Sequence, residues 1–345
     1  MSSSSNFSGV TLDPLVFNLA RRAVAFWDLD VESLEPIKVR ENSVFRIVSG
    51  GINRAVLRIH RFGYHSDEAL RSEFSWMEAL RRSGINTPRP ILSRSRNVFE
   101  KIEIPDLSEV RQSDVLDWVN GVQLGSVERG ISSDLGSVEP AYRAIGELAA
   151  RIHNQAANWK RPIAFARHAW DINGLVGECP LWGRFWELEA LSRSQRRLLE
   201  RVRPRLRRDL QEFGMSADRF GLIHADLVPE NVLVDGKHLS VIDFDDAGFG
   251  WHIFELATTL YFIRHETYYS KALDAVVAGY REYRSLPGSQ LEWLPAFMAA
   301  RGLTYLGWLH TRRGEKAAQE LASQLIELAM SVVEDYLSSP EMKRY

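Results

Sequence analysis

The stretch of sequence that decides the fold of this 345-residue chain runs Gly221-Leu222-Ile223-His224-Ala225-Asp226-Leu227-Val228-Pro229-Glu230-Asn231, then Val232-Leu233-Val234-Asp235-Gly236-Lys237-His238-Leu239-Ser240-Val241-Ile242-Asp243-Phe244-Asp245. Two short apolar runs flank an Asp-Gly turn, a pattern that predicts a β-hairpin. In an antiparallel hairpin, the residue entering the first strand lies across from the residue leaving the second. We therefore expect Asn231 and Asp243 to face each other at the open end of the hairpin.

The side chains at this open end have the chemistry of a magnesium site. Asn231 and Asp243 would both offer oxygens to one ion, and Mg²⁺ takes few protein oxygens beside water and phosphate, whereas Ca²⁺ takes more. Asp226 precedes Asn231 by five residues. A carboxylate there can accept a proton from an incoming hydroxyl while the metal screens phosphate charge, as phosphoryl transfer requires. We interpret His224 as structural.

The N-terminal third alternates between helix and strand patterns. Asp13-Pro14 opens an expected helix over 15–26, and a second expected helix over 66–83 stops at Gly84. Four β-type runs accompany these helices, and they cover residues 43–48, 55–60, 97–104 and 112–119. The order is that of a small lobe built on an antiparallel sheet.

Beyond residue 121 the sequence is mainly helical, with expected helices over 138–154 and 194–214. This shift predicts an α+β chain in two lobes. We expect an N-terminal lobe over 1–116, a linker over 117–121 and a larger C-terminal lobe over 122–345. Arg193–Arg208 is rich in arginine and forms either a solvated helix face or a docking surface for an acidic partner.

The charge, the N-terminal sequence and the cysteine count bear on which partners and compartments the chain favours. The formal net charge of −2 favours neither a nucleic-acid nor a membrane partner. No signal peptide is readable in the Ser-rich stretch Met1–Val10, and no apolar run is long enough to cross a bilayer. The single cysteine, Cys179, fits a reducing compartment. We expect a soluble cytoplasmic protein, and the oligomeric state stays open.

The motifs described above resemble those of a known enzyme family. His224-Ala225-Asp226 through Asn231, followed by Ile242-Asp243-Phe244-Asp245, is similar to the catalytic loop and metal-binding segment of the phosphotransferase enzyme family. Its members include aminoglycoside phosphotransferases, choline kinases, type II homoserine kinases and the bacterial stress response kinase. Protein kinases resemble the chain less, with Arg in place of Ala225 and Gly in place of Asp245. Two flanking segments resemble the family's helices before and after this region, namely Gly146–His153 and Trp251–Tyr261.

This resemblance implies a bilobal protein-kinase-like fold that binds ATP and magnesium, with nucleotide binding in the N-terminal lobe and catalysis and acceptor binding in the C-terminal lobe. Asp226 would be the catalytic base, and Asn231 and Asp243 the metal ligands. A basic strand residue would hold nucleotide phosphates and pair with a carboxylate on the next helix; Arg58 and Glu73 occupy those places.

The nucleotide contacts of the N-terminal half leave alternatives open. The family usually has lysine where this chain has Arg58, so Arg58 either holds phosphates, only pairs with Glu73, or lies exposed. Cover for the phosphates is assigned to Glu41-Asn42-Ser43. Adenine is expected to bond to the linker backbone from Asp117 to Val119, where Trp118 either stacks on the base or packs outward.

The segment after Asp243 bears on the phosphate acceptor. A helical pattern resumes at Trp251, which leaves no room for a long activation segment and favours an acceptor in a cleft under the C-terminal helices. Asp245 and Asp246 beside aromatic walls would suit an amine-bearing alcohol; the alternative is that the aromatics are core and Asp246 braces the loop or meets solvent. The candidate aromatics are Trp182, Trp186, Trp251, Tyr305 and Trp308. Glu255 is interpreted as a structural brace of the catalytic loop.

Three hypotheses follow for function. The leading one is a kinase that transfers the ATP γ-phosphate to a hydroxyl of a small molecule: an amino acid, an amino alcohol or an aminoglycoside-like compound. The second is a Ser/Thr protein kinase of the bacterial stress response type. The third is a non-catalytic nucleotide-binding module, for which the arginine at position 58 is the argument.

Overall fold

The computed structural model describes residues 14–39, 42–104, 107–126, 131 and 135–339. Met1–Val10 and Glu41, on which expectations fell, lie outside these residues. The described chain divides into two compact units, one formed by residues 1–74 and 88–119 and the other by residues 75–87 and 120–345. The lobes expected from the sequence were continuous, whereas residues 75–87 group with the second unit.

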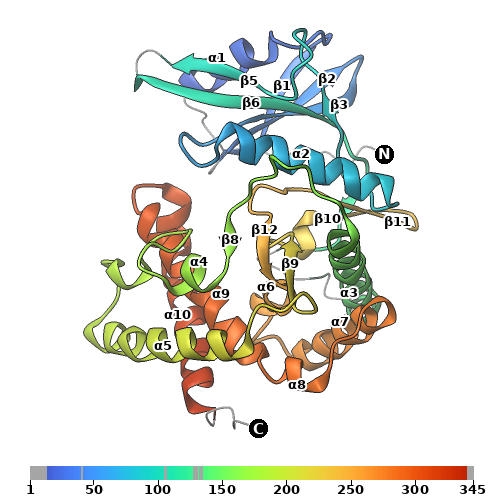
Figure 1. The fold of residues 1–345 in the computed structure, drawn as a ribbon. Helices are drawn as coiled ribbons and strands as arrows, with labels where there is room; N and C mark the ends of the chain where they lie inside the picture. The colour runs from blue at the N-terminus through green and yellow to red at the C-terminus, as the bar shows by residue number, and fades with distance from the viewer. Residues whose placement is uncertain (1–13, 40–41, 105–106, 127–130, 132–134, 340–345) are drawn as a thin grey trace. The chain divides into compact units, whose positions relative to one another are not determined.

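The first unit is built on an antiparallel sheet (Figure 1). Strands β1, β2, β3, β6 and β4 follow one another across it, and β5 also pairs with β6. Helix α1 lies against β3 and β5, and the core forms around Trp27, Phe45 and Leu57. The elements are α1 (Pro14–Val24), β1 (Ser33–Val39), β2 (Ser43–Ser49), β3 (Ile52–Ile59), α2 (Asp67–Arg82), β4 (Pro90–Ile91), β5 (Glu100–Ile104) and β6 (Glu109–Asp117).

The second unit is mainly helical, with two small sheets. One sheet has the order β11, β10, β7, and the other the order β8, β12, β9. Its strands are β7 (Val122–Gln123), β8 (Ala169–Trp170), β9 (Phe220–Ile223), β10 (Val232–Asp235), β11 (His238–Val241) and β12 (Gly248–Trp251). Its helices are α3 (Leu135–Asn158), α4 (Ile172–Val176), α5 (Arg193–Phe213), α6 (His252–Tyr261), α7 (Tyr269–Tyr283), α8 (Gly288–Leu291), α9 (Leu294–Thr311) and α10 (Lys316–Ser338), with 3-10 turns at Phe185–Glu187 and Pro229–Asn231.

Helix packing in the second unit depends on glycine. Helix α3 packs against α7, and α9 against α10 (Figure 1). A Cβ atom at Gly146 would lie 2.1 Å from the carbonyl oxygen of Val276, and one at Gly279 would lie 2.1 Å from that of Arg143. Because any larger side chain would push the backbones apart, these two glycines set the spacing of α3 and α7.

The predicted fold class is confirmed: an antiparallel sheet in the N-terminal part and a helical C-terminal part. Each helix and strand predicted from a pattern is present within a few residues. The pattern missed β1, whose Pro36 lies where its pairing with β2 shifts register, at the edge of the sheet where proline is tolerated. It also missed β12, where Gly248 and Gly250 allow close approach to His168 and Ile223.

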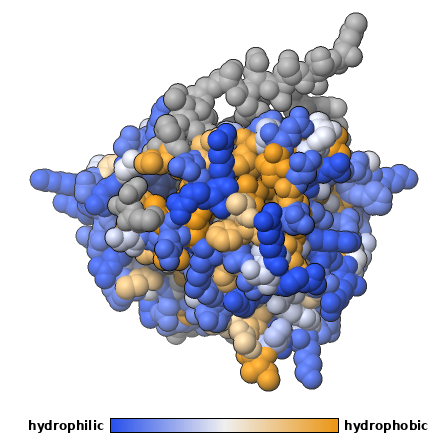
Figure 2. Space-filling model, turned by 90° about the horizontal axis from the view of Figure 1, so that it is seen from above, coloured by the Kyte–Doolittle hydropathy of each residue, from blue (hydrophilic) through white to orange (hydrophobic). Residues whose placement is uncertain are grey.

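The surface carries apolar residues among polar ones. Figure 2 shows hydrophobic residues interspersed with hydrophilic ones on one face of the molecule. Exposed large apolar side chains of the first unit include Leu15, Ile52 and Phe62, and single exposed residues of this kind are normal for a folded protein. Among the described residues, no helix combines the length and apolarity that a membrane span needs.

Candidate active site

The loop after β9 is held by His224, which is fully buried. Its Nε2 lies 3.0 Å from the carbonyl oxygen of Ile242, and its Nδ1 accepts the backbone N–H of Asp226 at 3.3 Å. An imidazole that donates from Nε2 and accepts at Nδ1 is neutral, with its proton on Nε2. His224 thus joins the loop that carries Asp226 to the strand end that precedes Asp243, which supports the structural interpretation.

Ala225 turns the chain between His224 and Asp226. Its φ of +64° lies in the left-handed region that non-glycine residues rarely adopt. The backbone N–H of Ala225 donates to Glu255 Oε2 at 3.1 Å, and Glu255 is fully buried in the first turn of α6. Burial raises the pKa of Glu255 above its ordinary value, although His224 and the N–H of Ala225 act in the opposite direction. Glu255 therefore braces the turn, as expected.

The carboxylate of Asp226 is held from two sides. Arg301 Nη2 donates to its Oδ1 at 2.7 Å, and Asn231 Nδ2 donates to its Oδ2 at 2.9 Å. Asn231 Nδ2 also lies 2.8 Å from the carbonyl oxygen of Asp226. The Asp226 side chain keeps 25% of its surface exposed, so it is fixed in orientation and still reachable.

The predicted hairpin is present as β10 and β11. Gly236, with φ of +58°, and Lys237 form its two-residue turn. The register differs by one residue from the expectation, because the N–H of Ile242 donates to the carbonyl oxygen of Asn231 at 3.0 Å. Asp243 comes one residue later, at a φ of +65° that ends the extended backbone.

The donor chemistry at this end of the hairpin fits a magnesium ion. Asn231 directs its amide nitrogen to Asp226, which leaves Oδ1 as the atom of this side chain that can bind a cation. Asp243 supplies a carboxylate. Oxygen ligands of this kind suit Mg²⁺, so the residues present are compatible with the ion that the family implies.

The segment after Asp243 is tied down through its backbone. Arg167 donates to the carbonyl oxygens of Phe244 and Asp245 at 3.1 and 2.5 Å. The carbonyl oxygen of Asp246 lies 2.9 Å from His168 Nε2 and accepts Trp170 Nε1 at 2.8 Å. These bonds hold the main chain that follows the predicted metal ligand.

Of the five candidate aromatics, two lie beside the catalytic loop. Trp182 donates from Nε1 to Asp246 Oδ1 at 3.2 Å, and its ring centroid lies 5.6 Å from that of Tyr305. The other three pack elsewhere. Trp186 lies under Arg203 at 3.9 Å, Trp251 is core and bonds to the Gly214 carbonyl, and Trp308 stacks with Arg312.

Arg301 was not foreseen from the sequence. This fully buried residue of α9 donates from Nη1 to the carbonyl oxygen of Ala225 at 3.2 Å and from Nη2 to Tyr305 Oη at 2.8 Å, besides its bond to Asp226. The available signal was a lone arginine in the apolar run Phe297-Met298-Ala299-Ala300-Arg301-Gly302-Leu303. A charge in such a run must find a buried partner.

In the first unit, Arg58 is a buried network residue. It lies 3.0 Å from Glu73, which realises the expected pair, and its Nε and Nη2 donate to Asp114 at 2.9 and 3.0 Å. His60 Nε2 lies 2.5 Å from Asp114. Burial alone would raise the pKa of Asp114, but Arg58 and His60 hold it below its ordinary value. Of the alternatives for Arg58, exposure is wrong, because 6% of the residue is accessible.

The predicted adenine contacts concern the end of β6. The backbone N–H of Asp117 donates to the Arg89 carbonyl at 2.8 Å, and the Asp117 side chain accepts the N–H of Arg89 at 2.6 Å. The N–H of Trp118 donates to the Arg54 carbonyl at 3.1 Å. These bonds use the backbone N–H groups of Asp117 and Trp118, so among the N–H groups of this backbone that of Val119 is the remaining candidate donor to adenine.

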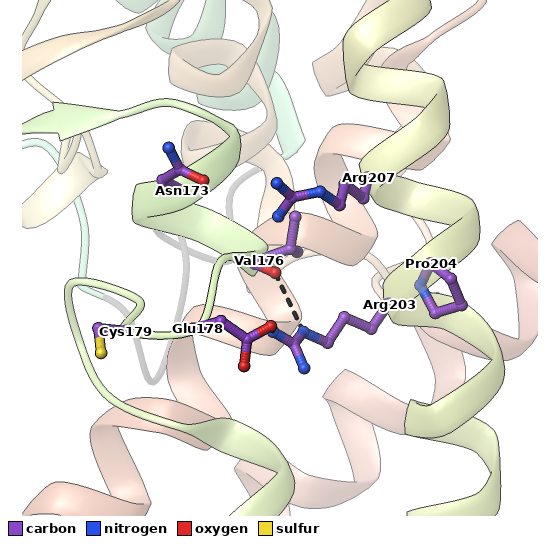
Figure 3. Close-up of a pocket in the computed structure, with 7 residues that line it drawn as sticks. All are labelled: Asn173, Val176, Glu178, Cys179, Arg203, Pro204 and Arg207. Atoms are coloured by element: carbon purple, nitrogen blue, oxygen red, sulfur yellow. Dashed lines mark hydrogen bonds and ion pairs between the residues drawn. The ribbon is translucent and has the colours of Figure 1, made fainter.

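A separate pocket of about 510 Å³ lies between α4 and α5 (Figure 3). Arg203 points into it but donates to the carbonyls of Val176 and Gly177 at 3.0 and 2.9 Å, and to Glu178 at 2.7 Å. Arg203 therefore ties the end of α4 to α5. The pocket is lined by none of the residues predicted for catalysis or nucleotide binding.

Comparison with known proteins agrees with this geometry. The profile of the phosphotransferase enzyme family matches residues 33–325. The chain is 22% identical to the amicoumacin kinase of Bacillus subtilis over 275 residues, which cover 74% of this chain and 73% of the relative.

Solved structures show the same likeness. A microcompartment-associated aminopropanol kinase superposes with a TM-score of 0.81 at 30% identity, and the match covers 93% of this chain and 98% of that one. An amicoumacin kinase in complex with AMP-PNP, Ca²⁺ and Ami superposes with a TM-score of 0.73 at 20% identity over 94% of each chain. The chain therefore belongs to the phosphotransferase enzyme family and is a phosphotransferase of the kinase type.

Proposed function

We propose that this protein transfers the γ-phosphate of ATP to the hydroxyl of a small amino alcohol, with Asp226 as the general base. The observation that carries the proposal is that Arg301 and Asn231 both donate hydrogen bonds to the Asp226 carboxylate. A general base must be within hydrogen-bond reach of the proton it takes and must keep its orientation. The two hydrogen bonds support a fixed orientation of the carboxylate, and its partial exposure leaves it reachable by an acceptor.

Asn231 and Asp243 are the proposed ligands of Mg²⁺. Their support is the amide orientation of Asn231, the oxygen chemistry of Asp243 and their neighbouring places at the end of one hairpin. When bound, the ion would neutralise charge on the phosphate oxygens. Asp226 would then accept the proton of the acceptor hydroxyl, and Arg58 with Glu73 and the backbone at Asp117 to Val119 are the proposed nucleotide contacts.

The proposed acceptor class rests on two independent supports. The first is the half-buried carboxylate of Asp246, which accepts Trp182 Nε1 and acts on the charge of Arg301 beside Asp226, so that an anion stands where an ammonium group could be bound, while the Trp182 and Tyr305 rings are themselves buried around Arg301. The aminopropanol kinase that shares 30% identity with this chain has a small amino alcohol in its name.

The test measures ADP release with Mg²⁺ and ATP against a panel of acceptors. The panel contains 1-amino-2-propanol, ethanolamine, homoserine, hydroxylysine, an aminoglycoside and a generic protein substrate. We expect turnover with the small amino alcohols. Turnover confined to the protein substrate would favour the protein-kinase hypothesis instead, and turnover confined to homoserine or the aminoglycoside would retain the kinase and overturn the acceptor class.

Three variants assign the residues. Asp226→Ala should keep metal-dependent nucleotide binding and lose about 10²–10⁴-fold in kcat, which is the usual contribution of a general base. Asp243→Ala should lose the metal-dependent part of nucleotide binding. Asp235→Asn is the matched control, because Asp235 lies exposed in the same hairpin. Turnover of Asp226→Ala close to the parent rate would overturn the mechanism.

A further inference from the structure

Arg301 is a charge that the fold has buried completely. It is 0% exposed, and apart from His310 it is the one ionisable cation of α9. Burying a guanidinium is unfavourable unless it is paired and its donors are used. The structure should therefore contain a specific partner for it.

The partners of Arg301 are two consecutive residues of the catalytic loop. Nη1 donates to the carbonyl oxygen of Ala225 at 3.2 Å, and Nη2 donates to the carboxylate of Asp226 at 2.7 Å. One planar group thus holds both the backbone of the left-handed residue and the side chain that follows it. Only arginine offers such a rigid fork of donors.

Aromatic rings fix the guanidinium in this position. Its centre lies 4.6 Å from the ring centroid of Tyr305, 4.9 Å from that of Trp182 and 5.9 Å from that of Phe254. Tyr305 also accepts Nη2 through its hydroxyl at 2.8 Å. The cation is therefore enclosed by rings and oriented by hydrogen bonds before any ligand binds.

From Arg301 onward, the backbone of α9 closely approaches two neighbouring segments of the chain. A Cβ atom at Gly302 would lie 2.9 Å from Val332 Cγ2 on α10, and one at Gly307 would lie 2.6 Å from the carbonyl oxygen of Gly183. These close approaches leave α9 little freedom to rotate or slide. The guanidinium of Arg301 therefore contacts Ala225 and Asp226 from a fixed position on α9.

We infer that Arg301 is the positioning residue of the catalytic base: from α9 it fixes the direction of the Asp226 carboxylate toward the acceptor hydroxyl. This inference rests on the proposed function, because it presupposes Asp226 as base. Arg301 acts through Asp226 and contacts no substrate. A misplaced base loses rate even when both substrates still bind, since about 1 Å of misplacement can cost about 10²-fold.

The test compares Arg301→Met, Arg301→Lys and Tyr305→Phe for kcat, acceptor KM, and the Kd of ATP with Mg²⁺. Arg301→Met should lose about 10–100-fold in kcat, with the nucleotide Kd and the acceptor KM within about twofold of the parent. Arg301→Lys should recover part of the lost kcat, because it restores the charge without the planar set of N–H donors. Tyr305→Phe keeps the ring and should lower kcat by a few-fold. It provides a folded variant for the test if Arg301→Met does not fold.

Arg205→Met is the matched control. Arg205 also packs over a tyrosine ring and donates to backbone carbonyls, those of Leu337 and Ser339, but it contacts no residue of the catalytic loop. Its loss should lower the melting temperature and leave kcat of the folded protein unchanged.

Two results would overturn the inference. One is a kcat of Arg301→Met and Tyr305→Phe within twofold of the parent while Asp226→Ala is inactive, which would leave the proposed function intact. The other is a parallel fall in nucleotide affinity and kcat and rise in acceptor KM in both Arg301 variants, as expected for a purely structural residue. An active Asp226→Ala variant would overturn the proposed function itself.

Discussion

The carboxylate of Glu255 accepts a hydrogen bond at 3.1 Å from the backbone N–H of Ala225, the residue that turns the chain with φ of +64° before Asp226. Replacing Glu255 by Ala leaves this buried donor without an acceptor, which costs about 1–3 kcal/mol in the free energy of unfolding. Activity should fall with it, because the turn positions Asp226. Glu255→Gln keeps an acceptor oxygen and should stay closer to the parent. Urea denaturation and kcat check both variants, and an equally stable, equally active Ala variant would contradict the role of the brace.

The network around Arg58 predicts a large stability effect in the first unit. Arg58→Met removes the guanidinium that pairs with the buried carboxylates of Asp114 and Glu73, while His60 still contacts Asp114. Breaking a buried pair from one side costs about 3–5 kcal/mol. Denaturation by guanidinium chloride measures the loss, and Arg54→Met, an exposed position on the same strand, should change stability by less than about 0.5 kcal/mol. A small effect of Arg58→Met would show that the network contributes little.

Two stacked histidines predict how stability depends on pH. The ring centroids of His153 and His252 lie 4.4 Å apart, and both residues are buried. Burial lowers the pKa of each histidine well below its ordinary value, and the Arg284 charge lowers both further. Below about pH 6.5 the unfolded chain therefore binds protons that the folded chain does not. The free energy of unfolding should fall as the pH is lowered through this range, by up to about 1.4 kcal/mol per pH unit for each histidine.

Denaturation curves at pH 7.5, 6.5 and 5.5 measure this slope. His252→Asn should reduce it, because one of the two groups then no longer titrates. His238→Asn, at an exposed position in the hairpin, serves as the control and should leave the slope unchanged. An equal slope in the parent and the His252 variant would disprove the assignment.

The amide of Asn231 predicts an asymmetry between two substitutions. Asn231→Ala removes the donor to Asp226, whereas Asn231→Asp places an anionic oxygen where Nδ2 lies, 2.9 Å from Asp226 Oδ2. In metal-free protein at pH 7, the Asp variant should be less stable than the Ala variant, by on the order of 1–4 kcal/mol. The difference should shrink toward pH 4, where a carboxyl can take up a proton and donate. Thermal unfolding in chelator at both pH values measures it, and an Asp variant as stable as the Ala variant at pH 7 would argue against this orientation of the amide.

Local sequence patterns predicted the structural elements that depend on residues close together in the chain. The hairpin at Asp235-Gly236 and the helices α1, α2, α3 and α5 follow from turn chemistry and periodicity, which a short window of sequence contains. The one-residue difference between Asn231 and Asp243 arises because the hairpin turn has two residues, Gly236 and Lys237, which pairs Asp235 with His238 and places Asn231 across from Ile242. The Asp-Gly signal predicted a turn but did not fix how many residues it contains, and that number sets the register.

The partners that hold the site were not predictable in this way. Arg301 meets Asp226 across a separation of 75 residues, and Asp114 meets Arg58 across 56. Their pairing is decided by how α9 packs and by how β3 and β6 align, and neither is contained in a local pattern. Arg301 was detectable as a charge that an apolar helix must satisfy, but its partner was not.

The fixed position of α9 has a consequence for fragments of this protein. A fragment that ended after α6 would contain Asp226, Asn231 and Asp243, and with them the catalytic-loop and metal-binding motifs that resemble the family. It would lack Arg301, and with it both hydrogen bonds that Arg301 makes to Ala225 and Asp226. Under the proposed mechanism, the smallest catalytic piece of this chain extends through α9.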